Sequence, residues 1–296
     1  MRKESKKVVI YNGALVKAYF YGDTLELTTS NGQHKQVIKV LSGKRYANLE
    51  TGEIKKMAID ANSRADNLKT VKVTMRHLRR LIAHNFQGGV NQLWVTLTYA
   101  ANVTEPAIAY KDYKAFMKRV RKLYSDIDYI SVIEPQASGR WHYHVLMKSN
   151  EKKLMIPNSK MQELWGKGYT KTKRLKRSDK VANYVLAYLS NLDIPTDDRS
   201  GRKCFVKGAR LYLYPKGLRI YRRSKGIEDP IEKSGIKHEI LEQSGISDRH
   251  ADFATQTIHV GHDTYKGEIT YITEFFNNIE RNDDIEQTKG NKGIDV

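Results

Sequence analysis

The chain has 296 residues, and its 52 Lys and Arg against 33 Asp and Glu give a formal net charge of +19 at pH 7. This length predicts about two domains with a substantial core, and the single cysteine, Cys204, excludes an intramolecular disulfide framework and a cysteine-rich zinc site. No apolar run approaches the ~18 residues of a membrane span, and one cysteine suits a reducing compartment. We therefore expect a cytoplasmic protein without membrane contact.

The positive charge is distributed unevenly along the chain. Residues 228–296 hold 15 acidic and 7 basic side chains, whereas residues 1–227 hold 45 basic and 18 acidic ones. This asymmetry favours a nucleic-acid-binding body followed by an acidic region, although a solvated basic face is the simpler alternative. We predict a β-rich region over residues 1–63, the main domain over 64–227, and an acidic region over 228–296 that contacts protein or mediates oligomerisation.

The expected elements begin with a β-meander over residues 7–56, in which Asn12-Gly13 and Asn31-Gly32 mark turns. The amphipathic pattern then predicts a basic helix over residues 65–85. The central segment predicts strand 93–99, helix 110–124, strands 129–134 and 141–148, helix 159–165, strand 169–174 and helix 178–191. After it we expect a hairpin from residues 209–214 and 218–222, and strands within 253–279.

The order of the central elements, β-α-β-β-α-β-α, indicates an α+β fold in which helices flank an antiparallel sheet. The N-terminal β-meander and a small C-terminal region are attached to it. Strands 129–134 and 141–148 are separated by a short connection that contains Pro135 and Gly139, so they should pair as a hairpin.

The strand over residues 141–148 carries the most informative pattern. Side chains two apart in a strand share a face, so His142 and His144 point the same way and supply half of a divalent metal site. The predicted hairpin brings Glu134 beside them as a third ligand, with Gln136 as the second choice. Because a His-x-His pair also arises by chance, the carboxylate delivered across the hairpin is what favours a metal site.

Helix 178–191 carries Tyr184 and Tyr188, which are four residues apart and therefore project from one helix face. One interpretation is that both rings pack at the edge of the core. The other is a pair of phenolic nucleophiles facing the metal. A phenol with a pKa of ~10 is a weak nucleophile at neutral pH, so this role needs a metal that activates the phosphate.

These motifs resemble those of the HUH endonuclease superfamily, specifically the rolling-circle replication initiators, over about residues 64–227. Residues 94–99 resemble the first motif, Glu134 to His144 resembles the second, metal-binding motif, and Tyr184 to Tyr188 resembles the third. There are two departures: a tyrosine, Tyr143, stands between the histidines, and the motif's usual lysine is absent. Ala187 and Asn191 stand at its positions, and the candidates for its role are Lys171, Lys173 and Lys180.

The resemblance implies that His142, His144 and Glu134 hold Mn²⁺ or Mg²⁺. It also implies that Tyr184 or Tyr188 nicks single-stranded or cruciform origin DNA, leaving a 5′-phosphotyrosine and a 3′-OH that primes replication and later closes the circle. The sequence has no Gly-x4-Gly-Lys-Ser/Thr loop, so a host helicase and polymerase are expected partners. A mobilisation relaxase or transposase with the same chemistry, and a non-catalytic DNA-binding regulator, are the alternatives.

Overall fold

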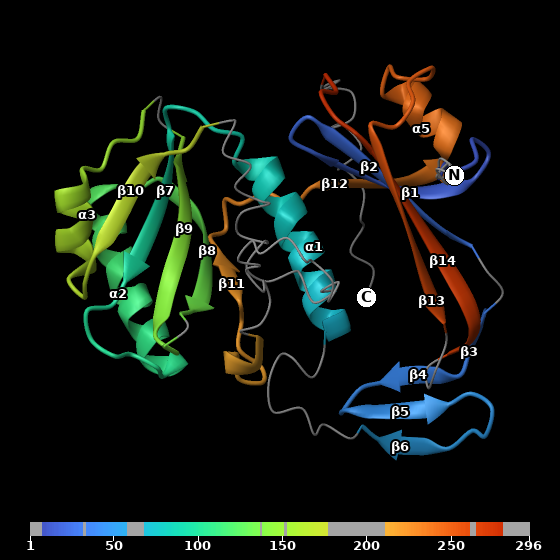
Figure 1. Cartoon of the computed structure of the whole chain (residues 1–296), viewed down its shortest axis with the longest axis horizontal. Coiled ribbons are helices and arrows are strands. Elements are labelled where there is room, and N and C mark those ends of the chain that lie inside the picture. Colours follow the sequence, from blue (N-terminus) through green and yellow to red (C-terminus); the bar gives the residue numbers. More distant parts are fainter. Residues whose placement is uncertain are drawn as a thin grey trace, which may run out of the picture. The chain divides into compact units, whose positions relative to one another are not determined.

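The computed structural model describes residues 8–31, 34–57, 68–136, 138–150, 153–176, 211–260 and 265–280. The predicted helix 178–191, with Tyr184 and Tyr188, lies outside these residues. The chain divides into two compact units (Figure 1). The central unit is Ala61–Asp229, and the terminal unit combines Met1–Asp60 with Pro230–Val296.

The central unit is built on a five-stranded sheet with the order β10-β7-β9-β8-β11, in which every neighbouring pair is antiparallel. The α+β class predicted from the sequence is confirmed. The strands, in chain order, are β7 (Gln92–Thr98), β8 (Ile127–Pro135), β9 (Trp141–Ser149), β10 (Thr170–Arg174) and β11 (Tyr221–Arg223). Strand β9 lies at the centre of the sheet, and all its residues but Lys148 are buried.

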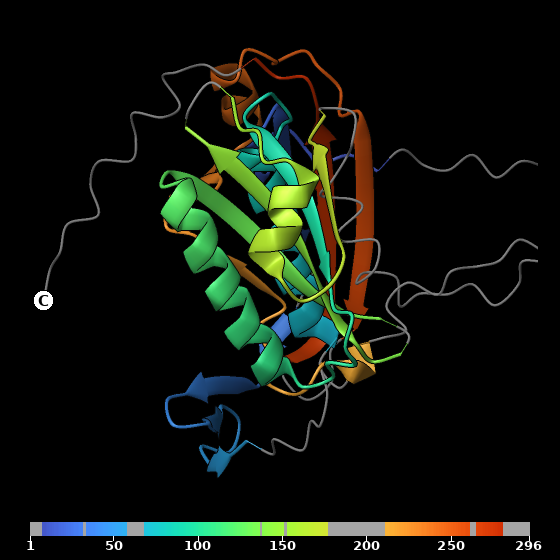
Figure 2. The same cartoon turned by 90° about the vertical axis from the view of Figure 1, so that its left-hand side faces the viewer.

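Helices lie against both faces of this sheet. Helices α2 (Pro106–Leu123) and α3 (Asn158–Trp165) cover one face together (Figure 2). On that face Tyr113 of α2 stacks on Tyr143 of β9, with ring centroids 4.5 Å apart. Lys148 points to the opposite face, where its Nζ donates to Asn85 Oδ1 of α1 (Leu68–Asn85) at 3.0 Å. The apolar stripes of these amphipathic helices join the side chains of the sheet in one core.

The predicted hairpin of residues 209–214 and 218–222 is wrong. Leu211–Leu213 form one turn of 3₁₀ helix, and β11 pairs with β8 instead. Tyr214 is fully buried, and its hydroxyl donates to the carbonyl oxygen of Ile133 at 2.9 Å. The edge of β8 offered unpaired backbone groups along a buried strand, and pairing with β11 satisfies them.

The terminal unit joins the two ends of the chain in one antiparallel sheet with the order β12-β1-β2-β14-β13, and β3 also pairs with β14. Its strands are β1 (Leu15–Tyr21), β2 (Thr24–Asn31), β3 (His34–Gln36), β12 (Ile231–Ile236), β13 (Phe253–Val260) and β14 (Tyr265–Phe276). Helix α5 is Lys237–Gln243, and β4 (Ile38–Leu41), β5 (Arg45–Asn48) and β6 (Ile54–Lys56) form a separate small sheet. The sequence treated residues 1–63 and 228–296 as separate regions, whereas β1–β12 and β2–β14 pairing unites them.

The division into units also changes the charge pattern. The central unit carries 34 Lys and Arg against 14 Asp and Glu, a net charge of +20, while the terminal unit carries 18 against 19. The basic N-terminal segment therefore nearly balances the acidic C-terminal one, and the excess positive charge belongs to the central unit. Among the described helices, none is long and apolar enough to cross a bilayer.

Candidate metal centre

The hairpin of β8 and β9 places three polar side chains on one face of the sheet. Glu134 lies directly opposite His142 in the antiparallel register, and Val132 lies opposite His144. His142 and His144 alternate along β9 with side chains that face α2, so both imidazoles point away from that helix. The short connection predicted from Pro135 and Gly139 forms as expected, since Gln136 N–H donates to Arg140 O at 2.7 Å.

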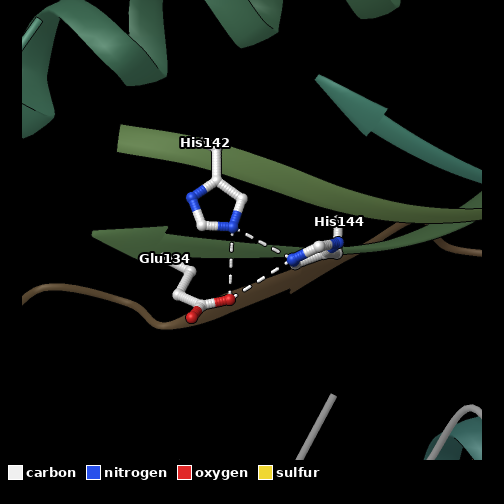
Figure 3. Close-up of side chains that lie close together, drawn as sticks. All are labelled: Glu134, His142 and His144. Atoms are coloured by element: carbon white, nitrogen blue, oxygen red, sulfur yellow. Dashed lines mark hydrogen bonds and ion pairs between the residues drawn. The ribbon is translucent and has the colours of Figure 1, made fainter. Parts of the chain in front are cut away.

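The side chains of Glu134, His142 and His144 converge on one point (Figure 3). One carboxylate oxygen, Glu134 Oε2, lies 3.3 Å from Nε2 of His142 and 3.3 Å from Nε2 of His144. The two Nε2 atoms lie 3.0 Å apart. All three residues are buried, with 5%, 8% and 8% of their surface exposed. The hairpin therefore delivers the predicted set of two imidazoles and one carboxylate.

These separations fit the coordination of a divalent cation. Two ligands at ~2.1 Å from an octahedral ion and at right angles to each other lie ~3.0 Å apart, close to the observed edges of the triangle. The donor set is also that of a two-histidine, one-carboxylate face, which leaves the remaining coordination positions open to water or substrate. The three residues therefore fit a dication that reaches its substrate on the open side.

Burial and mutual contact set the protonation of the three groups. Burial raises the pKa of Glu134, but hydrogen bonds and charge interactions with His142 and His144 outweigh it and lower the pKa to about 2. Burial lowers the pKa of His144, and His142 adds to this, while Glu134 partly opposes it. An ionised carboxylate beside a neutral imidazole is the state that metal ligation requires.

Neighbouring side chains hold the ring of His144. Thr96 of β7 lies opposite His144 in the register, and its Oγ1 contacts Nδ1 at 3.4 Å. The ring of Trp94 meets the same imidazole edge-on, with centroids 6.4 Å apart. Neither residue was expected in the site from the sequence. Their signal was the alternation of β7, which puts Trp94 and Thr96 on the face of the histidines once β7 and β9 are known to pair.

Tyr143, the residue between the two histidines, has a different role. Its side chain is 1% exposed, packs against Tyr113 of α2, and has a pKa raised by burial. It therefore anchors β9 in the core and does not take part in chemistry at the metal face. Gln136, the alternative third ligand, lies in the connection after β8, whereas the acidic ligand beside the two imidazoles is Glu134.

The segment that holds this site is similar to a known protein family. Residues 92–193 match the family model of the ORF2 class of replication-associated proteins. The matched segment begins at β7, includes the Glu134, His142 and His144 cluster, and ends beyond Tyr188. No curated protein and no solved structure gave a significant match to the chain. The central segment is therefore similar to replication-associated proteins.

Proposed function

We propose that the chain is a replication initiator of the HUH type, which nicks and joins single-stranded origin DNA. The observation that carries the proposal is the buried triangle of Glu134, His142 and His144, inside a segment that matches replication-associated proteins. The net charge of +20 on the central unit suits a polyanionic substrate. The order of the three sequence motifs supports the same function.

Each residue of the site has a defined task in this proposal. Glu134, His142 and His144 hold Mn²⁺ or Mg²⁺, and the two imidazole donors favour the transition metal. When bound, the cation would polarise a non-bridging oxygen of the scissile phosphate. Glu134 supplies a negative charge that stays ionised, and Thr96 helps to keep the His144 ring oriented.

The nucleophile in the proposal is the phenolic oxygen of Tyr184 or Tyr188. It forms a bond to phosphorus as the bond from phosphorus to the 3′ oxygen breaks, so the DNA strand ends as a 5′-phosphotyrosine and a free 3′-OH. The phenol gives up one proton and the departing 3′ oxygen gains one, which balances the step. The reverse reaction, with a 3′-OH as the attacking group, rejoins the strand. A host polymerase would extend the 3′-OH while a host helicase opens the duplex.

The test is an adduct assay with single-stranded origin DNA and Mn²⁺. Wild-type protein should form a covalent protein–DNA species that survives denaturation, and the double variant Tyr184→Phe, Tyr188→Phe should not. His142→Ala should lose the adduct while keeping salt-sensitive DNA binding. An adduct that persists in the double tyrosine variant would disprove the tyrosine mechanism.

Two other functions use parts of the same site. A mobilisation relaxase or transposase would form the same adduct, and replication of a cloned origin with the protein supplied, compared with strand transfer between cells, separates these from an initiator. A non-catalytic regulator would bind DNA and metal but form no adduct under any of these conditions. The match to replication-associated proteins favours the initiator.

A further inference from the structure

The edge strand β10 presents a row of exposed side chains on the same face as the metal triangle. Lys173 is exposed, and its Nζ lies 4.1 Å from the centroid of the Trp94 ring, which in turn contacts His144. Because side chains alternate along a strand, Lys171 and Tyr169 lie on that face too. Thr170, between them, is fully buried and points the other way, where Asn158 accepts its hydroxyl hydrogen bond.

The backbone of Tyr169 is held firmly against β7. Both the backbone N–H and the side-chain hydroxyl of Thr98 donate to its carbonyl oxygen, each at 2.9 Å. Gly168, with φ +157°, allows close approach: a Cβ there would lie 2.5 Å from Thr98 O and 2.5 Å from Ala100 N. The position of Tyr169 at the end of β10 is therefore set by backbone contacts.

Despite this rigid backbone, the Tyr169 side chain is 61% exposed. Thr98, which anchors it, lies directly opposite His142 in the register. Tyr169 is thus two strands from His142, roughly 10 Å at the usual strand spacing of ~4.8 Å. Lys171 lies opposite Thr96, in the row that continues to His144. An aromatic ring and a cation therefore flank the metal triangle along one edge.

We propose that Tyr169 and Lys171 form a subsite for single-stranded DNA at the β10 edge, in which the tyrosine ring stacks on a base and the lysine contacts a phosphate. The inference rests on the proposed function in taking DNA as the ligand of this face. Aromatic rings that stack on bases, combined with lysines that follow the backbone, are the usual means of binding single strands without sequence readout. The charge of +20 on the central unit complements such a ligand.

The subsite distinguishes single strands from duplexes. A base in a duplex is stacked on both sides, so its face is not open to a protein ring unless it leaves the stack. An unpaired base offers its face directly to Tyr169. Lys171 contacts phosphate in either form, because the backbone charge is common to both. The ring should therefore contribute to single-strand binding alone, and the lysine to both.

The test measures binding of a labelled single-stranded oligothymidylate to the full chain by fluorescence anisotropy in EDTA, so that no cleavage interferes. Tyr169→Ala should weaken binding about 5- to 150-fold, the range expected for one base–aromatic stack, while Tyr169→Phe should bind as wild type. Lys171→Gln should weaken binding and reduce its salt dependence, and Lys171→Arg should restore it. With duplex DNA, Tyr169→Ala should change nothing.

Matched controls come from the same unit. Tyr212 is 65% exposed and Lys118 is exposed on α2, over the opposite face of the sheet, so Tyr212→Ala and Lys118→Gln should leave single-strand binding unchanged. Circular dichroism verifies that each variant is folded. Folded Tyr169→Ala that binds oligothymidylate as tightly as wild type overturns the proposal.

The outcomes for this subsite and for the proposed function are separable. If wild type forms the covalent adduct but Tyr169→Ala binds normally, the nicking function stands and the subsite is wrong. If no adduct ever forms but Tyr169→Ala loses single-strand binding and Tyr169→Phe retains it, the subsite stands and the chain is a DNA-binding protein without nicking activity.

Discussion

Thr96 Oγ1 lies 3.4 Å from Nδ1 of His144, on the opposite side of the imidazole from Glu134. The two residues are 48 positions apart and meet because β7 and β9 are neighbours in the sheet. A hydroxyl that accepts from Nδ1–H would leave the Nε2 lone pair directed at the point where the three ligand atoms converge. This contact makes Thr96 a positioning residue of the candidate metal centre.

The first prediction concerns this contact. Thr96→Val keeps the shape of the side chain and removes the acceptor, so Mn²⁺ affinity measured by isothermal titration calorimetry should fall about 10- to 100-fold, the usual effect of losing such a partner. Thr96→Ser should keep most of the affinity. Thr74→Val, on α1, removes a hydroxyl that donates to its own helix and serves as the control. Unchanged affinity in folded Thr96→Val would show that the contact does not orient His144.

The pH dependence of metal binding is the second prediction. Protons compete with the metal for imidazole nitrogen, and burial lowers the pKa of His144, so this ligand stays neutral to a lower pH than an ordinary histidine. Glu134, with a pKa of about 2, stays ionised throughout. Affinity for Mn²⁺ should therefore be level above about pH 7 and fall as the medium becomes more acidic. Calorimetry across that range checks this, and a decline in affinity that already begins at about pH 8 would contradict it.

The third prediction concerns a buried ion pair in the terminal unit. Lys237 Nζ lies 2.8 Å from Glu274 Oε2, and the two side chains are 5% and 1% exposed. Lys237 also donates to Ile10 O, and Glu274 Oε1 accepts from Ile10 N–H, so the pair fastens the N-terminal segment to β14. Glu274→Gln leaves a buried charge without its partner, and the free energy of unfolding should fall by ~3–5 kcal/mol.

The control for this variant is the exposed pair of Lys17 and Glu232, which are about half exposed and also join β1 to β12. Lys17→Gln should cost ~0–1 kcal/mol. Denaturant unfolding followed by circular dichroism measures both. Equal effects of the two substitutions would mean that the buried pair contributes no more than a surface one.

A fourth prediction tests the close approach at Gly168. Gly168→Ala would place a methyl group against the backbone of Thr98 and Ala100, which must move because neither is a flexible side-chain end. The β10 edge should shift, lowering the melting temperature and single-strand binding together. Gly217 has φ +77° and nothing within 4 Å of the added Cβ, so Gly217→Ala adds backbone strain alone and should leave DNA binding intact.

The two-unit organisation leads to a fifth prediction. Residues 61–229 expressed alone should keep Mn²⁺ binding and salt-sensitive DNA binding, because they hold the triangle and the excess positive charge. Deleting 230–296 from the full chain should instead unfold residues 1–60, since β1 loses β12 and β2 loses β14. Limited proteolysis and calorimetry check both shortened proteins. A folded 61–229 fragment that fails to bind metal would contradict this division.

Local patterns were sufficient to predict the central β-α-β-β-α-β order and the Glu134, His142 and His144 set. Side chains alternate with period two along a strand, and a short connection forces neighbouring strands to pair. The nucleophile assigned to Tyr184 or Tyr188 stays a prediction from the motif pattern. Pairings between distant segments had no such local signal.

The strands that meet across long separations became known from the three-dimensional packing. It paired β1 with β12 and placed β11 on β8, against the predicted hairpin. It also brought Thr96 to His144 and set Tyr169 at the open edge beside them. Backbone hydrogen bonding leaves few buried strand edges unsatisfied, and which segment fills an edge depends on the packing of the whole unit, which local patterns do not encode.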